Sequence, residues 1–219
     1  MAEDKISTLL NPVQQAVEQY DDHALAKKRS ELGLQSCYVI CVFGRLINWK
    51  GQAECIDAIE IVANTLPNVK LLMIGDDSEF GGYKECLVDK VVKKNLADIV
   101  QFIGYTKETD LYYQLCDLVV HCSIEPEPFG LVITEAMLNR VPIVASCYGA
   151  GPELVKDGEN GLIADPLNPS DLASKILKIA RSPELQQLFV TNGMALAGTL
   201  KAKFYAEKLF EIYQKVTST

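Results

Sequence analysis

The chain has 219 residues, of which 48% are hydrophobic and 23% charged, and its formal net charge is −8 at pH 7. This size and composition are typical of a globular protein with a substantial hydrophobic core. The negative charge disfavours a broad surface for nucleic acid or anionic membranes, because such surfaces are usually basic. An anionic ligand would therefore be held by a few placed cations and backbone N–H groups.

Cysteine usage and the N-terminal residues indicate an intracellular protein. The seven cysteines form no C-x-x-C pair and mostly lie in apolar runs, which predicts reduced, buried thiols. With only two histidines, a zinc site has little support, and we expect no metal. The start MAEDKISTLL is polar, and no apolar run approaches the ~20 residues that span a bilayer. We therefore expect a cytoplasmic protein without a transmembrane segment.

Short apolar runs alternate with helical patterns along most of the chain. Residues 5–35 look helical and polar, with no strand. Six runs rich in Val and Ile read as buried strands: 37–43, 69–75, 99–104, 117–122, 142–146 and 161–164. Five stretches between them read as helices: 50–66, 82–95, 107–115, 130–139 and 152–156. The alternation predicts an α/β, Rossmann-like parallel sheet with helices on both faces, whose ligands bind beyond the carboxyl ends of the strands.

After the last predicted strand, only helical patterns follow, at 169–181, 183–197 and 201–216. The last of them carries one apolar stripe with helical spacing: Tyr205, Leu209, Ile212, Tyr213 and Val216. The expected organisation is therefore a helical N-terminal segment (1–36), a Rossmann-like domain (37–200) and a C-terminal amphipathic helix (201–219).

The first predicted strand runs into FGRLINWKG, residues 43–51, which opens a helix. Gly44 permits a tight exit, so Arg45 and Lys50 can project toward the same edge of the sheet. The spacing is not that of a P-loop. Two cations beside a helix N-terminus nevertheless suit a diphosphate. From this stretch alone, a surface Arg and Lys flanking a turn is the alternative.

The stretch EPEPFGLVITEAM, residues 125–137, places two carboxylates around a turn and a helix start. A helix that begins near Phe129 would point the N–H groups of Phe129, Gly130 and Leu131 at a phosphate. Glu135 would lie roughly 7–8 Å along the helix, at ~1.5 Å per residue, where a ribose could donate to it. Glu127 lies ahead of the helix, where it would meet whatever the diphosphate carries.

Other interpretations of these acids and of one glycine pair stay open at this point. Each glutamate also fits an ordinary polar position, and the pair would suit a glycosidase, although that leaves the two cations unexplained. In CYGAGPEL, residues 147–154, the pattern G-x-G-x-x-L is a weak dinucleotide fingerprint because Leu154 replaces the third glycine. Small residues lining the same ligand edge are the preferred interpretation.

Taken in order, seven segments resemble the C-terminal, nucleotide-sugar-binding domain of retaining GT-B glycosyltransferases of the family 4, or group 1, type: GRLINWKG, LLMIGD, VQFIGYT, CDLVVHCS, EPEPFGLVITEAM, VPIVAS and GENGLIADP. The resemblance implies that Arg45 and Lys50 hold the donor diphosphate and stabilise the charge that develops as it leaves. It implies that Glu127 contacts the transferred sugar and Glu135 the ribose.

The same resemblance assigns the remaining binding residues. The N–H groups around Gly130, including those of Phe129 and Leu131, would face the phosphate, and the backbone of Ile103 would touch the base. It implies a UDP-, GDP- or ADP-linked sugar as substrate, with neither a cofactor nor a divalent metal.

The resemblance covers one of the two domains of such enzymes, whose donor and acceptor meet in the cleft between them. Residues 1–36 are too few for an acceptor domain of ~150–200 residues. We therefore expect a hexosyltransferase-type donor-binding half that transfers sugar poorly alone and needs an N-terminal acceptor domain or a separate acceptor subunit. A GT-B nucleotide-sugar epimerase and a non-catalytic nucleotide-sugar-binding subunit with a partner are the alternatives.

Overall fold

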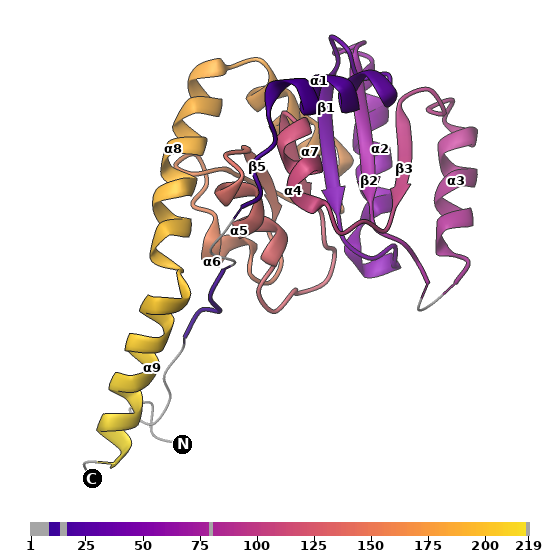
Figure 1. Cartoon of the computed structure of the whole chain (residues 1–219). Coiled ribbons are helices and arrows are strands. Elements are labelled where there is room, and N and C mark those ends of the chain that lie inside the picture. Colours follow the sequence, from indigo (N-terminus) through magenta and orange to yellow (C-terminus); the bar gives the residue numbers. More distant parts are fainter. Residues whose placement is uncertain (1–8, 14–16, 79–80, 218–219) are drawn as a thin grey trace.

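A computed structural model of the chain describes residues 9–13, 17–78 and 81–217. Within them a single six-stranded sheet forms, in the order β3-β2-β1-β4-β5-β6, and every neighbouring pair is parallel (Figure 1). The strands are β1 (Tyr38–Phe43), β2 (Val69–Ile74), β3 (Val100–Gly104), β4 (Leu118–His121), β5 (Ile143–Ser146) and β6 (Leu162–Ala164). The predicted α/β, Rossmann-like parallel sheet is confirmed.

The helices follow the predicted alternation, with ends displaced by a few residues. They are α1 (Asp22–Glu31), α2 (Gln52–Ala63), α3 (Tyr83–Lys93), α4 (Thr109–Leu115), α5 (Leu131–Leu138), α6 (Gly151–Leu154), α7 (Pro169–Ala180), α8 (Pro183–Thr199) and α9 (Ala202–Thr217). A short 3₁₀ turn, Asn48–Lys50, precedes α2.

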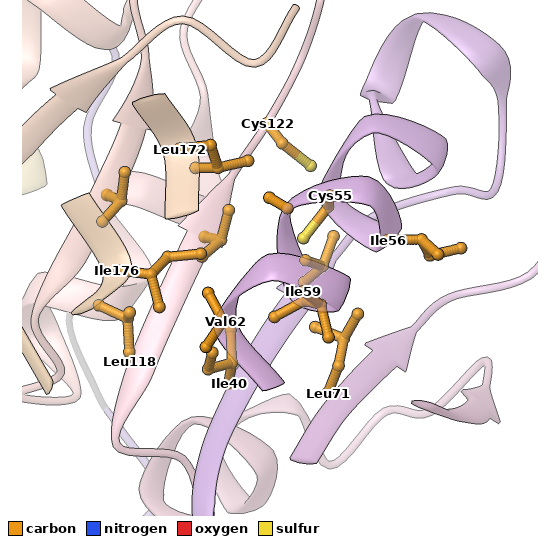
Figure 2. Packing of buried hydrophobic residues seen from close by; sticks show 14 of the residues in the cluster. Ile40, Cys55, Ile56, Ile59, Val62, Leu71, Leu118, Cys122, Leu172 and Ile176 are labelled. Carbon is orange, nitrogen blue, oxygen red and sulfur yellow. The ribbon is translucent and has the colours of Figure 1, made fainter. Parts of the chain in front are cut away.

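Helices cover both faces of the sheet, and the strand residues alternate between them. In β1, Ile40 and Val42 belong to the core cluster that contains α2, α3 and α7, whereas Val39 and Cys41 belong to the cluster that contains α4, α5 and α6. Figure 2 shows part of the first cluster, in which side chains of α2 and α7 meet those of the strands. Burial on both faces explains why each strand reads as a continuous apolar run.

The strand order creates a crevice at the carboxyl end of the sheet. From β1 the chain continues outward to β2 and β3, and it then returns to β4 on the other side of β1. In the β1–β4 pair, Ile40 lies opposite Leu118 and Cys41 opposite Val119. The loops that leave these two strands turn away from each other, and ligands bind in the crevice between such loops.

The prediction of helix over residues 5–35 is wrong for two described stretches, because 9–13 and 17–21 are not helical. Residues 5–8 and 14–16 of that prediction lie outside the described residues. The helical part is α1, none of whose residues is buried. A polar segment without an apolar stripe gains little from packing as a helix, and packing supplies most helical stability.

Hydrogen bonds to distant elements hold the non-helical part of this segment. The backbone N–H of Val13 donates to the carbonyl oxygen of Leu200 (2.9 Å). The N–H of Glu18 donates to Asp110 Oδ2 (2.9 Å) on α4. These partners are far away in the sequence, which explains why local periodicity did not predict this path.

Of the seven cysteines, four are buried as predicted: Cys41, Cys55, Cys116 and Cys122. The prediction is wrong for Cys86, which is exposed on α3. In α3 only Leu87 and Val91 are buried, and the helix face that carries Cys86 meets solvent.

The predicted C-terminal amphipathic helix is present as α9, but in this structure it projects beyond the body of the domain (Figure 1). None of the residues that form it is buried. Tyr213 and Val216 of the predicted apolar stripe are 61% and 71% exposed, and Phe210 is also 61% exposed. Within residues 9–13, 17–78 and 81–217, no helix combines the length and the apolar character needed to cross a membrane.

Candidate functional site

A groove made of two hollows lies over the carboxyl ends of the strands. The first hollow, of about 270 Å³, is lined by Phe43, Ile74, Asp76, Tyr105, Thr106 and Glu135, among others. The second, of about 410 Å³, is lined by Trp49, Lys50, Glu127, Pro128, Phe129 and Leu131, among others. Gly44, Arg45 and Val132 line both hollows, which makes them neighbouring parts of one groove.

The loop that follows β1 carries both cations into the groove, and glycine backbones pack tightly around it. A Cβ on Gly75 would lie 2.0 Å from the carbonyl oxygen of Gly44. A Cβ on Gly51 would lie 1.8 Å from the carbonyl oxygen of Cys122, and Gly51 has φ +72°. Any larger residue at either position would have to displace backbone, so these glycines fix the path between Arg45 and Lys50.

A buried amide supports the same loop. Gln52, the first residue of α2, is completely buried, and its Nε2 donates to the carbonyl oxygen of Arg45 (2.8 Å). The Nζ of Lys50 lies 4.5 Å from the ring centroid of Trp49. Both contacts restrict the loop before any ligand arrives, so a ligand would meet the cations largely in place.

Glu127 lies at the centre of a network of polar side chains in the second hollow. Its Oε1 accepts from Lys50 Nζ (2.6 Å), and its Oε2 lies 2.7 Å from His121 Nε2 and accepts from Ser123 Oγ (2.8 Å). Burial by itself would raise the pKa of this carboxyl, but the hydrogen bonds from His121 and Lys50 outweigh burial and lower the pKa to about 2. Glu127 is therefore a fixed, ionised carboxylate at neutral pH.

The loop after β5 holds the backbone of Glu127. The N–H of Ala150 donates to the carbonyl oxygen of Glu127 (3.0 Å), and a Cβ on Gly149 would lie 2.2 Å from the Glu127 nitrogen. A Cβ on Gly151 would lie 1.9 Å from the carbonyl oxygen of Ser146. The two glycines thus allow close backbone packing against the loop that carries Glu127, and they are not among the residues that line either hollow.

The helix that begins beside Glu127 starts slightly later than predicted. Leu131 is the first residue of α5, and Gly130 precedes it in the left-handed region with φ +72°. Phe129, Gly130 and Leu131 all line the second hollow. Amides in the first turn of a helix have no acceptor within the helix. This end of α5 therefore offers N–H groups and the positive end of the helix dipole to the groove.

Glu135 lies one turn farther along α5 and lines the first hollow. The hydroxyl of the buried Tyr113 donates to Glu135 Oε2 (2.8 Å), and the Tyr113 ring stacks on Phe43 with centroids 3.8 Å apart. Burial is the main cause that raises the pKa of Glu135, and Asp110 adds to it, whereas the Tyr113 hydrogen bond lowers it. The groove thus places Glu135 in the first hollow and Glu127 in the second, and Arg45 lines both hollows.

Seven of the eight predicted site residues line this groove: Arg45, Lys50, Glu127, Phe129, Gly130, Leu131 and Glu135. Ile103 is not among the residues that line it; its side chain packs, partly buried, against the α4–α5 side of the core. The β2–β3 register shifts after Met73, so that Ile74 pairs with Gly104. The chain reaches the groove two residues later, at Tyr105 and Thr106.

Sequence reasoning missed several residues of the groove and its support. Tyr105 is 69% exposed beside the first hollow, and Asp76 follows β2 there. His121 and Ser123 support Glu127 from the end of β4. Their positions at strand ends were a usable signal, since parallel strands deliver their carboxyl-end residues to one edge.

Comparisons with known proteins find a matching family model, similar sequences and similar folds. A family model described as "Glycosyl transferases group 1" matches residues 26–195. Spore coat protein SA of Bacillus subtilis (strain 168) is 30% identical over 200 residues, which cover 88% of this chain and 52% of that protein. The chain spans about half the length of several curated relatives that it matches.

Solved structures share the fold. Anabaena Alr3699/HepE in complex with UDP superposes with a TM-score of 0.83 and 31% identity, over 90% of this chain and 54% of that one. The same protein also has a structure in complex with UDP-glucose. The C-terminal domain of a glycosyl transferase group 1 family protein (LpcC) from Francisella tularensis has a TM-score of 0.70 and 27% identity, over 89% of this chain and 97% of that one.

Proposed function

Because this chain belongs to the glycosyl transferases group 1 family, we propose that it is the donor-binding, C-terminal domain of a retaining, family 4 hexosyltransferase that works in the cytoplasm. Its substrate in this proposal is a nucleoside-diphosphate sugar. One observation carries the proposal: Arg45, Lys50 and the N-terminal end of α5 meet in one hollow.

In this proposal the groups along the groove meet the parts of the donor in order. The diphosphate would lie between the two cations and the first turn of α5, which together favour an anion. As the bond to the sugar breaks, negative charge grows on the diphosphate, and Arg45 and Lys50 would stabilise it. The carboxylate of Glu135 would accept hydrogen bonds from the ribose in the first hollow, and Glu127 would accept them from the sugar in the second.

The acceptor would bind to a second domain or subunit. The similarity over 97% of an isolated C-terminal domain, against about half of full-length relatives, supports this division. The exposed apolar side chains of α9, Phe210, Tyr213 and Val216, fit a contact with that second part. In this proposal the chain alone binds the donor but transfers its sugar slowly.

Titration calorimetry tests the binding part of the proposal. The folded chain is titrated with UDP, GDP and ADP and with the corresponding nucleotide sugars, and at least one of these pairs is expected to bind. Absence of binding by all of them to a chain that melts cooperatively would contradict the proposal. Retention is tested separately, by the anomeric configuration of the product when an acceptor domain is supplied.

A further inference from the structure

We propose that His121 and Ser123 are positioning residues for recognition of the donor sugar. In this proposal, which rests on the function proposed above, they hold Oε2 of Glu127 so that Oε1 is the oxygen that accepts from a sugar hydroxyl. Neither residue is among those that line the two hollows, so their effect should appear only when a sugar is attached to the diphosphate.

The contacts divide the two oxygens of Glu127 between different partners. His121 Nε2 lies 2.7 Å from Oε2, and Ser123 Oγ donates to the same oxygen at 2.8 Å. Each carboxylate oxygen accepts about two hydrogen bonds, so Oε2 is fully occupied. Oε1 accepts from Lys50 at 2.6 Å and has capacity for another donor.

Lys50 does not close Oε1 to a ligand. Its ammonium group has three N–H donors, and the residue lines the second hollow together with Glu127. One donor can stay on Oε1 while the others turn to a phosphate oxygen. A diphosphate at Lys50 would therefore bring the attached sugar next to the oxygen that has room for it.

The imidazole of His121 is placed for this one contact. The His121 side chain is 4% exposed, and because a carboxylate only accepts, Nε2 carries the hydrogen. The opposite nitrogen, Nδ1, is buried and has no hydrogen-bond partner in the part of the chain that the structure describes. A buried histidine that served packing alone would be expected to satisfy both nitrogens or to be replaced by an apolar residue.

The surroundings of the two donors are the N-terminal end of α5 and the end of β5. A Cβ on Gly130 would lie at an ordinary contact distance of 3.7 Å from His121 Nε2, which places the imidazole beside the N-terminal end of α5. The carbonyl oxygen of Ser123 accepts from Ser146 Oγ at 2.6 Å. Ser146 ends β5, so Ser123 is fixed by the neighbouring strand of the sheet.

The experiment compares two affinities in one protein: that of a nucleoside diphosphate and that of the same diphosphate with its sugar. The probes are UDP with UDP-glucose, UDP with UDP-N-acetylglucosamine, and GDP with GDP-mannose. The ratio is the affinity for the nucleotide sugar divided by the affinity for its diphosphate, and the pair with the largest ratio in the unaltered chain is used. In His121→Leu, we expect the ratio to fall to about one while the affinity for the diphosphate stays unchanged. His121→Gln retains an N–H donor and is expected to restore part of the ratio.

Ser123→Ala makes a smaller change and carries the test if His121→Leu does not fold. It should lower the ratio in the same direction. Asn160→Ala is the matched control, because Asn160 is also buried and makes two hydrogen bonds, to Lys156 N and Leu154 O, in another loop. This control is expected to change the melting temperature but not the ratio.

The outcomes separate this inference from the proposed function. If the unaltered chain binds no nucleoside diphosphate, the proposed function fails and the inference fails with it. If diphosphates bind but attached sugars add nothing, or if His121→Leu and Ser123→Ala keep the full ratio, the positioning role is overturned while the donor-binding function stands.

Discussion

Lys50 Nζ lies 2.6 Å from Glu127 Oε1, which joins the loop after β1 to the loop after β4 across the groove. Both side chains are 13% exposed, so water screens this ion pair only weakly. Any anion that enters the second hollow therefore meets a cation that already has a protein partner.

Replacing Lys50 is expected to weaken binding and to destabilise the fold. Lys50→Ala should lower the affinity for a nucleoside diphosphate about tenfold or more, because a hydrogen bond to a charged group contributes roughly 1.5–3 kcal/mol. Arg45→Ala should weaken binding similarly. Calorimetry measures the affinity, and Lys178→Ala, which removes an exposed cation of α7, is the control. Equal affinities in Lys50→Ala and Lys178→Ala would contradict the phosphate role.

The low pKa of Glu127 gives its contribution to stability a defined pH range. The folded state lowers this pKa from an ordinary value near 4.5 to about 2. A lowered carboxyl pKa stabilises the fold above the unfolded value, so the contribution is complete above about pH 4.5 and disappears as the pH falls toward 2. Linkage gives up to about 3 kcal/mol, roughly halved at pH 3.

Urea unfolding of the unaltered chain and of Glu127→Gln checks this expectation. The difference in unfolding free energy between them should be largest at pH 7 and should shrink at pH 3. Glu125→Gln removes an exposed carboxylate two residues away and should show little difference at either pH. A Glu127→Gln difference that stays constant with pH would refute the linkage.

Gly149 is expected to tolerate no side chain because of its contact with Glu127. Gly149→Ala would place a Cβ 2.2 Å from the Glu127 nitrogen, whereas a Cβ on Gly158 would meet no atom within 4 Å. Both glycines have positive φ, +63° and +79°, so the backbone strain is similar. Gly158→Ala should cost about 1–2 kcal/mol of unfolding free energy.

Gly149→Ala should cost more than Gly158→Ala and should also reduce binding of a nucleotide sugar, because the loop that carries Glu127 must shift. Denaturant unfolding and calorimetry on both variants decide the matter. If Gly149→Ala and Gly158→Ala lose equal stability and sugar binding is unchanged, the added Cβ at Gly149 is accommodated without a shift of the loop that carries Glu127, and the prediction is wrong.

Tyr113 is expected to matter for the part of the groove around Glu135, where we propose that the ribose binds. Tyr113→Phe keeps the stacked ring but removes the hydroxyl that donates to Glu135. The hydrogen bond lowers the pKa of this buried carboxyl, so its loss should raise the pKa further and cost about 1 kcal/mol of stability. Binding of a nucleoside diphosphate should weaken, and Tyr112→Phe, the same change one residue earlier on α4, is the control.

Most of the sheet could be predicted from the sequence, because strands buried on both faces must be apolar throughout, as in β1 and β2. Once parallel strands are assigned, Arg45, Lys50 and Glu127 follow at their carboxyl ends. The first turn of α5 was predictable for the same reason, since Pro128 and Gly130 mark a helix start.

Contacts set by tertiary structure could not be predicted. Val13 bonds to Leu200, far away in the sequence, and no local pattern encodes such a pairing. Ile103 is not among the residues that line the groove, although its position near the end of a strand pointed there, and the β2–β3 register is irregular beside it. His121 read as part of a buried strand, and its bond to Glu127 depends on how the following loop folds back.

The exposed position of α9 separates the requirements of folding from those of contact with another molecule or domain, which usually act on the same residues. Since no residue of this helix, as far as the structure describes it, is buried, substitutions at Phe210 or Tyr213 should leave the melting temperature of the domain nearly unchanged. Selection for stable folding would then not constrain the residue types at these two positions. Any constraint on their chemistry must come from what the helix touches outside the domain.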